Sequence, residues 1–144
     1  MRFFVTTSKR AHDVSDLFAR ALAYFLPHAV FENRGRKTVD DVWARAMQLG
    51  KNAVAIVNER EDKPCEIQLL VFSEGDWDYG PNLAFDDLKF PKEKLKFEEP
   101  VGSIVGFDFG EEDGELVETE EIDEWICWKR GKSKICFKNF RWEK

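Results

Sequence analysis

The chain has 144 residues, a formal net charge of −6 and 43% hydrophobic residues, a composition that suits one domain with a buried core and excludes a disordered chain. The sequence has no apolar run near the roughly 18 residues that a membrane helix needs, and its opening, MRFFVTTSKR, lacks the long apolar core of a signal peptide. We therefore expect a soluble, cytoplasmic protein without a membrane partner.

The first half alternates strand and helix patterns. Three short apolar runs predict strands at 2–8, 29–32 and 52–59. Between them, apolar residues recur every three or four positions, as in an amphipathic helix. The two expected apolar stripes are Val14, Leu17, Phe18, Ala21, Leu22 and Phe25, and then Val39, Val42, Trp43, Ala46 and Met47.

Residues that begin and end helices support this reading. Asp13 or Ser15 is expected to cap the first helix, and Pro27 to close it. Thr38 and Asp41 resemble a capping box at the start of the second helix, which Gly50 ends. The order β-α-β-α-β with short links predicts a parallel α/β unit.

The second half is expected to be richer in strands. We predict a strand at 65–72, a turn-rich loop at 74–82, a further strand at 83–90 and a polar connector at 91–100. Another strand is expected at 103–110.

The last strands are expected to form a hairpin over 124–142, with Gly131-Lys132 as its two-residue turn. That register places Arg130 opposite Ser133, Trp128 opposite Ile135 and Cys127 opposite Cys136. We expect two packed thiols at this last pair, because disulfides are rare in reducing compartments. A disulfide is the alternative for an oxidising or extreme-thermophile setting.

Charge is distributed unevenly along the chain. Residues 1–51 carry a net charge of +4 and the remainder −10. Within the remainder, 108–124 holds ten acids and no base, which we interpret as a solvated acidic loop, whereas 128–144 holds seven bases and one acid. Such asymmetry suggests an anionic partner for one surface.

The parallel unit predicts where that surface lies. The carboxyl ends of parallel strands meet at one edge of a sheet, where ligands commonly bind. We therefore expect five cations to converge there beside two helix N-termini, whose N–H groups favour phosphate. The loop at 33–37 (NRGRK) has two open interpretations, a solvated turn and a phosphate-binding loop, and Glu59, Glu61 and Asp62 should border the site. The five cations are Lys9, Arg10, Arg34, Arg36 and Lys37.

The residues give little support for catalysis or for a cofactor. Ser8 with His12, or Cys65 with His28, could pair a nucleophile with a base, but neither lies in a known nucleophile motif. The sequence contains no Walker loop, no GxGxxG after the first strand and no CxxC pair. We therefore expect no enzyme activity, no cofactor and no metal.

Aromatic residues offer a weaker signal for RNA. If exposed, they could stack on bases, although aromatic residues in strand patterns are usually core. The six considered are Trp77, Tyr79, Trp125, Trp128, Phe140 and Trp142.

Several motifs together resemble the Brix domain. VTTSKR (5–10) and FLPHAVFENRGRKTVDDVWARAMQLGKNAVAIVNERED (25–62) are similar to the family's N-terminal half, and DYGPNLAF (78–85) is similar to its later GP-bearing segment. The likeness is close over 4–62, patchy to 85 and weak in the acidic region. Two departures are AHD after Arg10 and Asn82 where threonine is usual. The short length resembles the archaeal single-domain members.

The resemblance implies an α/β fold of two related halves, about 1–73 and 74–144 in a single domain, similar to the anticodon-binding domain of class IIa aminoacyl-tRNA synthetases. It also implies a non-catalytic ribosome-biogenesis factor that binds rRNA or pre-rRNA and assists its processing and subunit assembly. Carried onto this chain, the family's basic opening falls on Lys9 and Arg10, its NRG motif on Asn33, Arg34 and Gly35, and its GP pair on Gly80 and Pro81. With Arg36 and Lys37 from the topology argument, the expected RNA-binding residues are Lys9, Arg10, Asn33, Arg34, Gly35, Arg36 and Lys37. The alternative is a scaffold that binds ribosomal or assembly proteins through 108–124.

Overall fold

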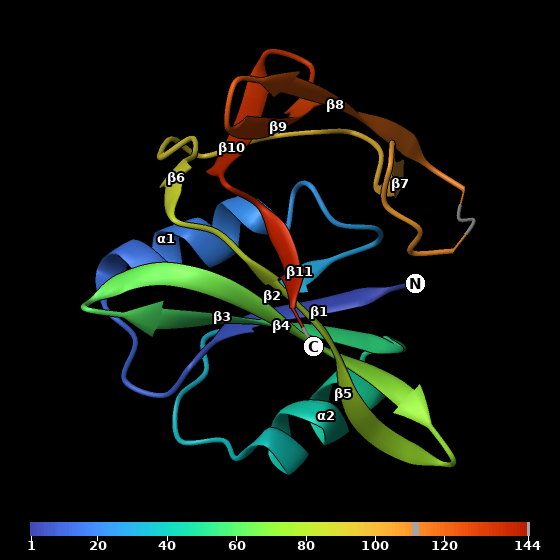
Figure 1. Cartoon of the computed structure of the whole chain (residues 1–144). Helices are drawn as coiled ribbons and strands as arrows, with labels where there is room; N and C mark the ends of the chain where they lie inside the picture. Colours follow the sequence, from blue (N-terminus) through green and yellow to red (C-terminus); the bar gives the residue numbers. More distant parts are fainter. Residues whose placement is uncertain (111–112, 144) are drawn as a thin grey trace.

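Two β-sheets share the chain in the computed structural model, which describes residues 1–110 and 113–143 (Figure 1). The first sheet has six strands in the order β11-β5-β4-β3-β1-β2, and the second has five in the order β6-β10-β9-β8-β7. The first sheet is built from β1 (Phe3–Thr7), β2 (Val30–Phe31), β3 (Ala53–Arg60), β4 (Lys63–Ser73), β5 (Asp76–Ala84) and β11 (Arg141–Glu143). The second is built from β6 (Asp87–Lys89), β7 (Val101–Ile104), β8 (Glu115–Ile122), β9 (Trp125–Arg130) and β10 (Ser133–Lys138).

The parallel unit predicted from the sequence is confirmed. Strand β1 lies between β2 and β3 and is parallel to both, with Val5 opposite Phe31 on one side and Ala55 on the other. The apolar run from Ala53 to Val57 is buried throughout, as expected of a strand covered on both faces. The mixed α/β class with a strand-rich second half is thus the observed fold.

The two helices cover opposite faces of the first sheet (Figure 1). Helix α1 (Asp13–Leu22) packs into the large core that the first sheet shares with the second. Helix α2 (Val39–Gln48) packs on the other face in a smaller cluster that includes Phe4, Ile56 and Leu70. Among the helices of the described residues, none is long and apolar enough to cross a membrane.

The helix ends agree only in part with the sequence prediction. The capping box at α2 is confirmed, since the Thr38 hydroxyl accepts from the Asp41 N–H and the Asp41 carboxylate accepts from the Thr38 N–H. For α1 the prediction was wrong, because His12 is the N-cap and Ser15 is buried inside the helix. The helix also stops at Leu22, before Phe25. Leu17 and Met47, both assigned to apolar stripes, are exposed.

Strand β5 corrects the loop expected at 74–82. The segment pairs with β4 as an antiparallel hairpin, with Phe72 opposite Trp77 and Val71 opposite Asp78. Its turn residues concealed the strand, since Glu74 and Gly75, at positive φ, make the turn. The boundary expected between the two halves, at residues 73 and 74, falls at this turn. The strand expected at 83–90 is divided between the end of β5 and β6.

The second sheet also differs from expectation. The acidic segment interpreted as a loop contains β8, whose Val117 is fully buried, while Glu111 and Glu112 lie outside the described residues. Of the strand expected at 103–110, only Ser103 and Ile104 lie in a strand, β7, which spans Val101–Ile104. Residues 91–100 form the irregular connector that was predicted.

The predicted hairpin register is confirmed, with Arg130 opposite Ser133, Trp128 opposite Ile135 and Cys127 opposite Cys136. The hairpin ends at Lys138, however. The chain then crosses back to the first sheet, where β11 pairs with β5.

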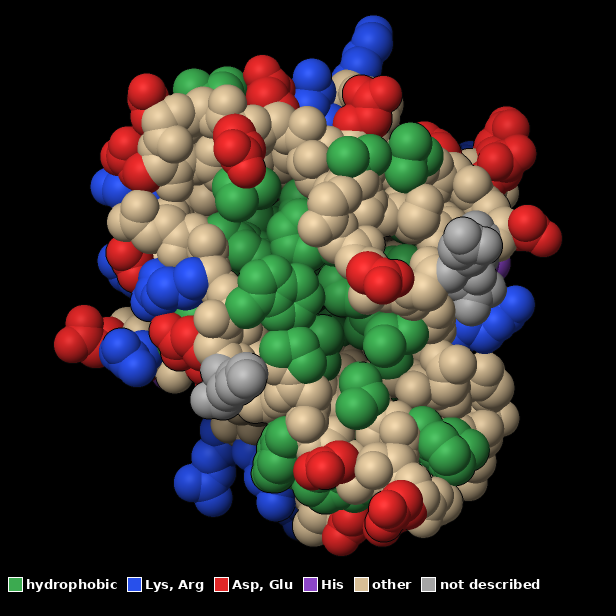
Figure 2. Space-filling model, turned by 45° about the vertical axis from the view of Figure 1, so that its right-hand side comes forward, with side chains coloured by type: hydrophobic (Ala, Val, Ile, Leu, Met, Phe, Trp, Pro, Cys, Tyr) green, Lys and Arg blue, Asp and Glu red, His purple; other side chains and the backbone are tan. Residues whose placement is uncertain are grey.

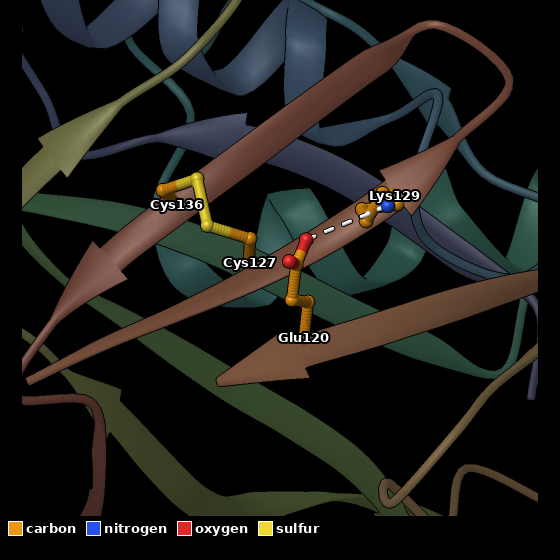
Figure 3. The surroundings of a disulfide bond; sticks show 4 residues. All are labelled: Glu120, Cys127, Lys129 and Cys136. Atoms are coloured by element: carbon orange, nitrogen blue, oxygen red, sulfur yellow. Dashed lines mark ion pairs between the residues drawn. A yellow bond between two sulfur atoms is a disulfide. The ribbon is translucent and has the colours of Figure 1, made fainter. Parts of the chain in front are cut away.

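A disulfide joins Cys127 and Cys136, so the expectation of two packed thiols is wrong (Figure 3). The two Cα atoms are 4.0 Å apart on neighbouring strands, a spacing short enough for the sulfur atoms to bond. Beside it, Glu120 of β8 forms an ion pair with Lys129 of β9 at 3.4 Å. These contacts join β8, β9 and β10 at the middle of the second sheet.

A buried arginine holds the second sheet to two connecting segments, the one after α1 and the one before β7. Arg130 of β9 donates from Nη1 to the carbonyl oxygen of Tyr24 at 2.8 Å, from Nη2 to that of Glu99, and to the carboxylate of Glu115. Its guanidinium also lies over the ring of Phe97, 3.9 Å from the centroid. A buried charge needs such partners, so Arg130 fixes the second sheet against the segment that follows α1.

Candidate nucleic-acid interface

The loop at 33–37 is held to the end of β1 by its own arginine. The Arg34 side chain donates from Nη1 to the Thr7 carbonyl at 2.9 Å and from Nε to the Lys37 carbonyl at 2.8 Å. Arg34 is only 7% exposed, and this burial lowers the pKa of its guanidinium. Gly35 follows with φ of 59°, a conformation that glycine adopts without steric cost. Arg34 therefore shapes the loop, and its Nε and Nη1 donors are already used.

A shallow hollow of 450 Å³ lies where β1, α1 and this loop meet. Three of the predicted site residues that line it, Arg10, Asn33 and Gly35, are exposed. Arg20 and Asp16 of α1 also line it, and both were missed from the sequence because a helix face does not reveal which loop it adjoins. Arg20 stacks over the Phe31 ring at 4.9 Å, which leaves its charge at the surface. The polar side chains at the surface of the hollow are thus the guanidinium groups of Arg10 and Arg20, the amide of Asn33 and the carboxylate of Asp16.

Arg10 has an unusual backbone conformation. Its φ is 58°, a left-handed value that costs a residue with a side chain about 1–2 kcal/mol. Such strain persists where the surrounding structure imposes it, and it is more frequent at functional positions than elsewhere.

The other predicted cations lie beside the start of α2. Lys9 and Lys37 are close enough to Asp41 to lower the pKa of its carboxyl group, after the larger effect of the hydrogen bonds from Thr38. Arg36 is exposed on the loop. The capping box uses N–H groups of this helix end, and Asp40 and Asp41 occupy its first turn. The cations, rather than the helix N-terminus, therefore supply most of the positive potential here.

An acidic cluster borders this surface, as expected. The His12 imidazole lies between two carboxylates, with Nδ1 2.8 Å from Glu59 and Nε2 3.4 Å from Asp62. The hydrogen bond to Glu59, followed by the charge of Asp62, raises the pKa of His12. These three side chains could surround a cation, but with both ring nitrogens directed at carboxylates the geometry suits a protonated imidazolium. The His12 side chain therefore connects the start of α1 to the β3–β4 turn, where Asp62 lies.

The nucleophile–base pairs considered from the sequence have other partners. His12 is engaged by Glu59 and Asp62, and Nε2 of His28 lies 2.7 Å from the carbonyl oxygen of Asp113. The Cys65 thiol is directed at the Asn58 carbonyl, and burial raises its pKa, which lowers the thiolate fraction.

The aromatic candidates fall into different environments. Trp128 is fully buried, as aromatic residues in strands usually are, whereas Tyr79 and Trp142 are exposed. Trp77 and Tyr79 lie on the β4–β5 hairpin among acidic residues, which repel a phosphate backbone. None of the six is among the residues that line the hollow.

The chain resembles ribosomal biogenesis proteins in both sequence and fold. It is similar in sequence to a probable Brix domain-containing ribosomal biogenesis protein of Thermococcus kodakarensis, at 26% identity over 89 residues. The expected resemblance to the Brix-domain proteins is thus confirmed. No family model matches the sequence.

Two solved structures share the fold. One is a probable ribosomal biogenesis protein from Aeropyrum pernix K1, with a TM-score of 0.73 and 15% identity over 99% of this chain and 96% of that one. The other is Mil, an archaeal Imp4-like protein, with a TM-score of 0.71 and 19% identity over 97% of this chain and 99% of that one.

The match to the curated relative is partial. It covers 62% of this chain and 43% of the relative, so this chain matches less than half of that protein's length.

Proposed function

We propose that this chain is a ribosome-biogenesis factor that binds ribosomal or precursor ribosomal RNA through the basic edge, and that it assists RNA processing and subunit assembly without catalysis. The basic edge consists of Lys9, Arg10, Asn33, Arg34, Gly35, Arg36 and Lys37. The proposal places the protein in the cytoplasm as a single Brix-type domain.

One observation carries the proposal. Arg10 after β1 lies at least 23 positions before Asn33 and Gly35 after β2, yet all three line one hollow, although the chain as a whole is acidic. Concentrating exposed cations at one edge of an acidic protein favours a polyanion at that edge and repels it elsewhere. The ribosomal biogenesis proteins that share the fold make RNA the best candidate.

Within this proposal the seven residues have different roles. Lys9, Arg10, Arg36 and Lys37 contact phosphates, and Asn33 offers an amide to sugar or base edges. Arg34 acts indirectly by holding the loop, and Gly35 allows its turn.

Filter binding of a ribosomal RNA transcript tests the proposal. Arg10→Glu with Arg36→Glu is expected to weaken binding strongly, and the affinity of the unchanged protein should fall steeply with salt. The matched control is Lys132→Glu with Lys134→Glu, which reverses two exposed cations in the second sheet. Equal losses in the two double variants would show that overall charge, rather than this edge, governs binding.

A protein-binding scaffold is the second candidate function. It is favoured by Glu118 and Glu121, which are exposed on β8 within the acidic 108–124 segment. Reversing both charges should release a basic assembly protein and leave RNA binding intact if this candidate holds.

A further inference from the structure

The end of the β4–β5 hairpin forms an arm that lies outside both the basic edge and the acidic 108–124 segment. Strand β3 begins at Ala53, opposite Val71, while β4 and β5 continue to pair beyond that point through Phe72–Trp77 and Ser73–Asp76. Figure 1 shows this end of the hairpin projecting past the rest of the sheet. Register places it away from the basic edge, because β4 runs from the carboxyl end of β3 toward its start.

Aromatic side chains occupy one face of the arm. Residues directly opposite in an antiparallel pair share a face. The pairs Leu70–Tyr79 and Phe72–Trp77 therefore lie together on the face that α2 covers. Phe72 is 58% exposed and Tyr79 62%, beyond the cover that α2 provides.

Two of these aromatic residues, Trp77 and Tyr79, are held in place. The Trp77 indole N–H donates to the Asp40 carboxylate of α2 at 2.7 Å, and its ring meets Tyr79 edge to face at 5.1 Å. An ordered, exposed aromatic surface binds a partner with little loss of side-chain entropy.

The charge along the hairpin segment is of one sign. Residues 64–88 contain six acids and neither lysine nor arginine. Glu74, Asp76 and Asp78 are exposed at the end of the arm, and Asp40 stands on the adjoining helix. Such a field repels RNA and attracts cations.

We propose that this aromatic, acidic arm (Phe72, Trp77 and Tyr79 with Glu74, Asp76 and Asp78) docks an arginine-rich segment of a partner protein. A guanidinium stacks on an exposed aromatic ring, a contact that a lysine ammonium makes less well. Asp76 and Asp78 alternate with Trp77 and Tyr79 and project from the opposite face of the arm, so these carboxylates attract the neighbouring arginines of the segment rather than the one that stacks. The arm thus complements a cationic polypeptide, whereas the basic edge complements a polyanion, and the two sites lie on separate parts of the sheet.

Fluorescence anisotropy with a labelled peptide of alternating arginine and glycine tests the proposal. The unchanged protein should bind this peptide more tightly than the same peptide with lysine. Phe72→Ser with Tyr79→Ser keeps every charge and should weaken binding about tenfold, the value of two exposed cation–π contacts. Asp76→Lys with Asp78→Lys should abolish it.

The matched control is Ile122→Ser with Leu116→Ser, since these residues are 48% and 50% exposed on β8 in another acidic part of the surface. It should bind as the unchanged protein does. Equal weakening in the control, or no loss in the aromatic variant, would show that general charge attraction accounts for the binding, and would overturn the proposal. Loss of RNA affinity in the aromatic variant would also overturn it, by assigning the arm to RNA.

Discussion

Arg34 donates from Nη1 to the carbonyl oxygen of Thr7 at 2.9 Å, so the loop after β2 is anchored to the last residue of β1 by a side chain within its own basic motif. The most buried cation of NRGRK is thus the one that organises the others. Arg34 therefore has a structural role that the exposed Arg36 of the same segment does not share.

We expect Arg34→Ala to lower the free energy of unfolding by about 1–3 kcal/mol, because it leaves two carbonyl groups without their donor. The matched variant Arg36→Ala removes the same charge from an exposed position and should change stability by less than about 0.5 kcal/mol. Urea denaturation measures both. If Arg36→Ala is as destabilising as Arg34→Ala, the anchoring role is wrong.

The conformation of Arg10 permits a test that separates backbone from charge. Arg10→Gly and Arg10→Ala both remove the guanidinium, but glycine alone adopts φ of 58° freely. We expect Arg10→Ala to be the less stable of the two, by about 1 kcal/mol, and the two to lose RNA affinity equally. Unequal affinities, measured alongside thermal melting, would mean that loop shape contributes to binding.

The ion pairs of His12 predict a pH dependence. Because the folded-state pKa of His12 is raised, above all by Glu59, its stabilising contribution is complete below the unfolded pKa of about 6.5 and is lost as pH rises through the folded value. Titration of the imidazole protons by NMR should therefore give a pKa above 6.5. Glu59→Gln should lower it, whereas Glu61→Gln, a change on the neighbouring exposed residue, should leave it unchanged.

The disulfide predicts a redox dependence of stability. Reduction of Cys127–Cys136 should lower the free energy of unfolding by about 2 kcal/mol, seen as a lower melting temperature with reductant present. RNA binding should persist, since the basic edge belongs to the other sheet. Cys65→Ser serves as control and should retain the full effect of reductant. Alkylation of all three cysteines in unreduced, denatured protein would contradict the disulfide.

The sequence predicted the parallel unit well because its signals are local and agree with one another. Short apolar runs, period-3.6 apolar patterns, the Thr38–Asp41 box and Gly50 all lie within a few residues of the elements that they determine. The 125–138 hairpin was equally accessible, since a two-residue turn fixes the register of both strands.

The remaining elements depend on long-range contacts. Asp76–Ala84 contains turn-forming residues, and becomes a strand through pairing with β4 and the bond from Trp77 to Asp40. Glu115–Ile122 is acidic, but its strand is held between β7 and β9. Both predictions failed because local composition does not reveal the cross-strand pairing that makes these segments strands.

The candidate site shows the same division. Its position at the strand ends followed from topology, and Arg10, Asn33 and Gly35 do meet there. The burial of Arg34 had no local signal, since arginine beside glycine is usually exposed. Arg20 and Asp16 enter the site from a helix face whose neighbour is set only when the chain folds.

Strand β11 has a consequence for the order in which the protein forms during translation. The edge of the first sheet beyond β5 is covered by residues 141–143, which are synthesised after every strand of the second sheet. Until they leave the ribosome, β5 presents open backbone donors and acceptors, the feature that lets nascent chains pair with the wrong neighbour. Sealing of this edge is therefore a late event, and it couples completion of the first sheet to emergence of the second.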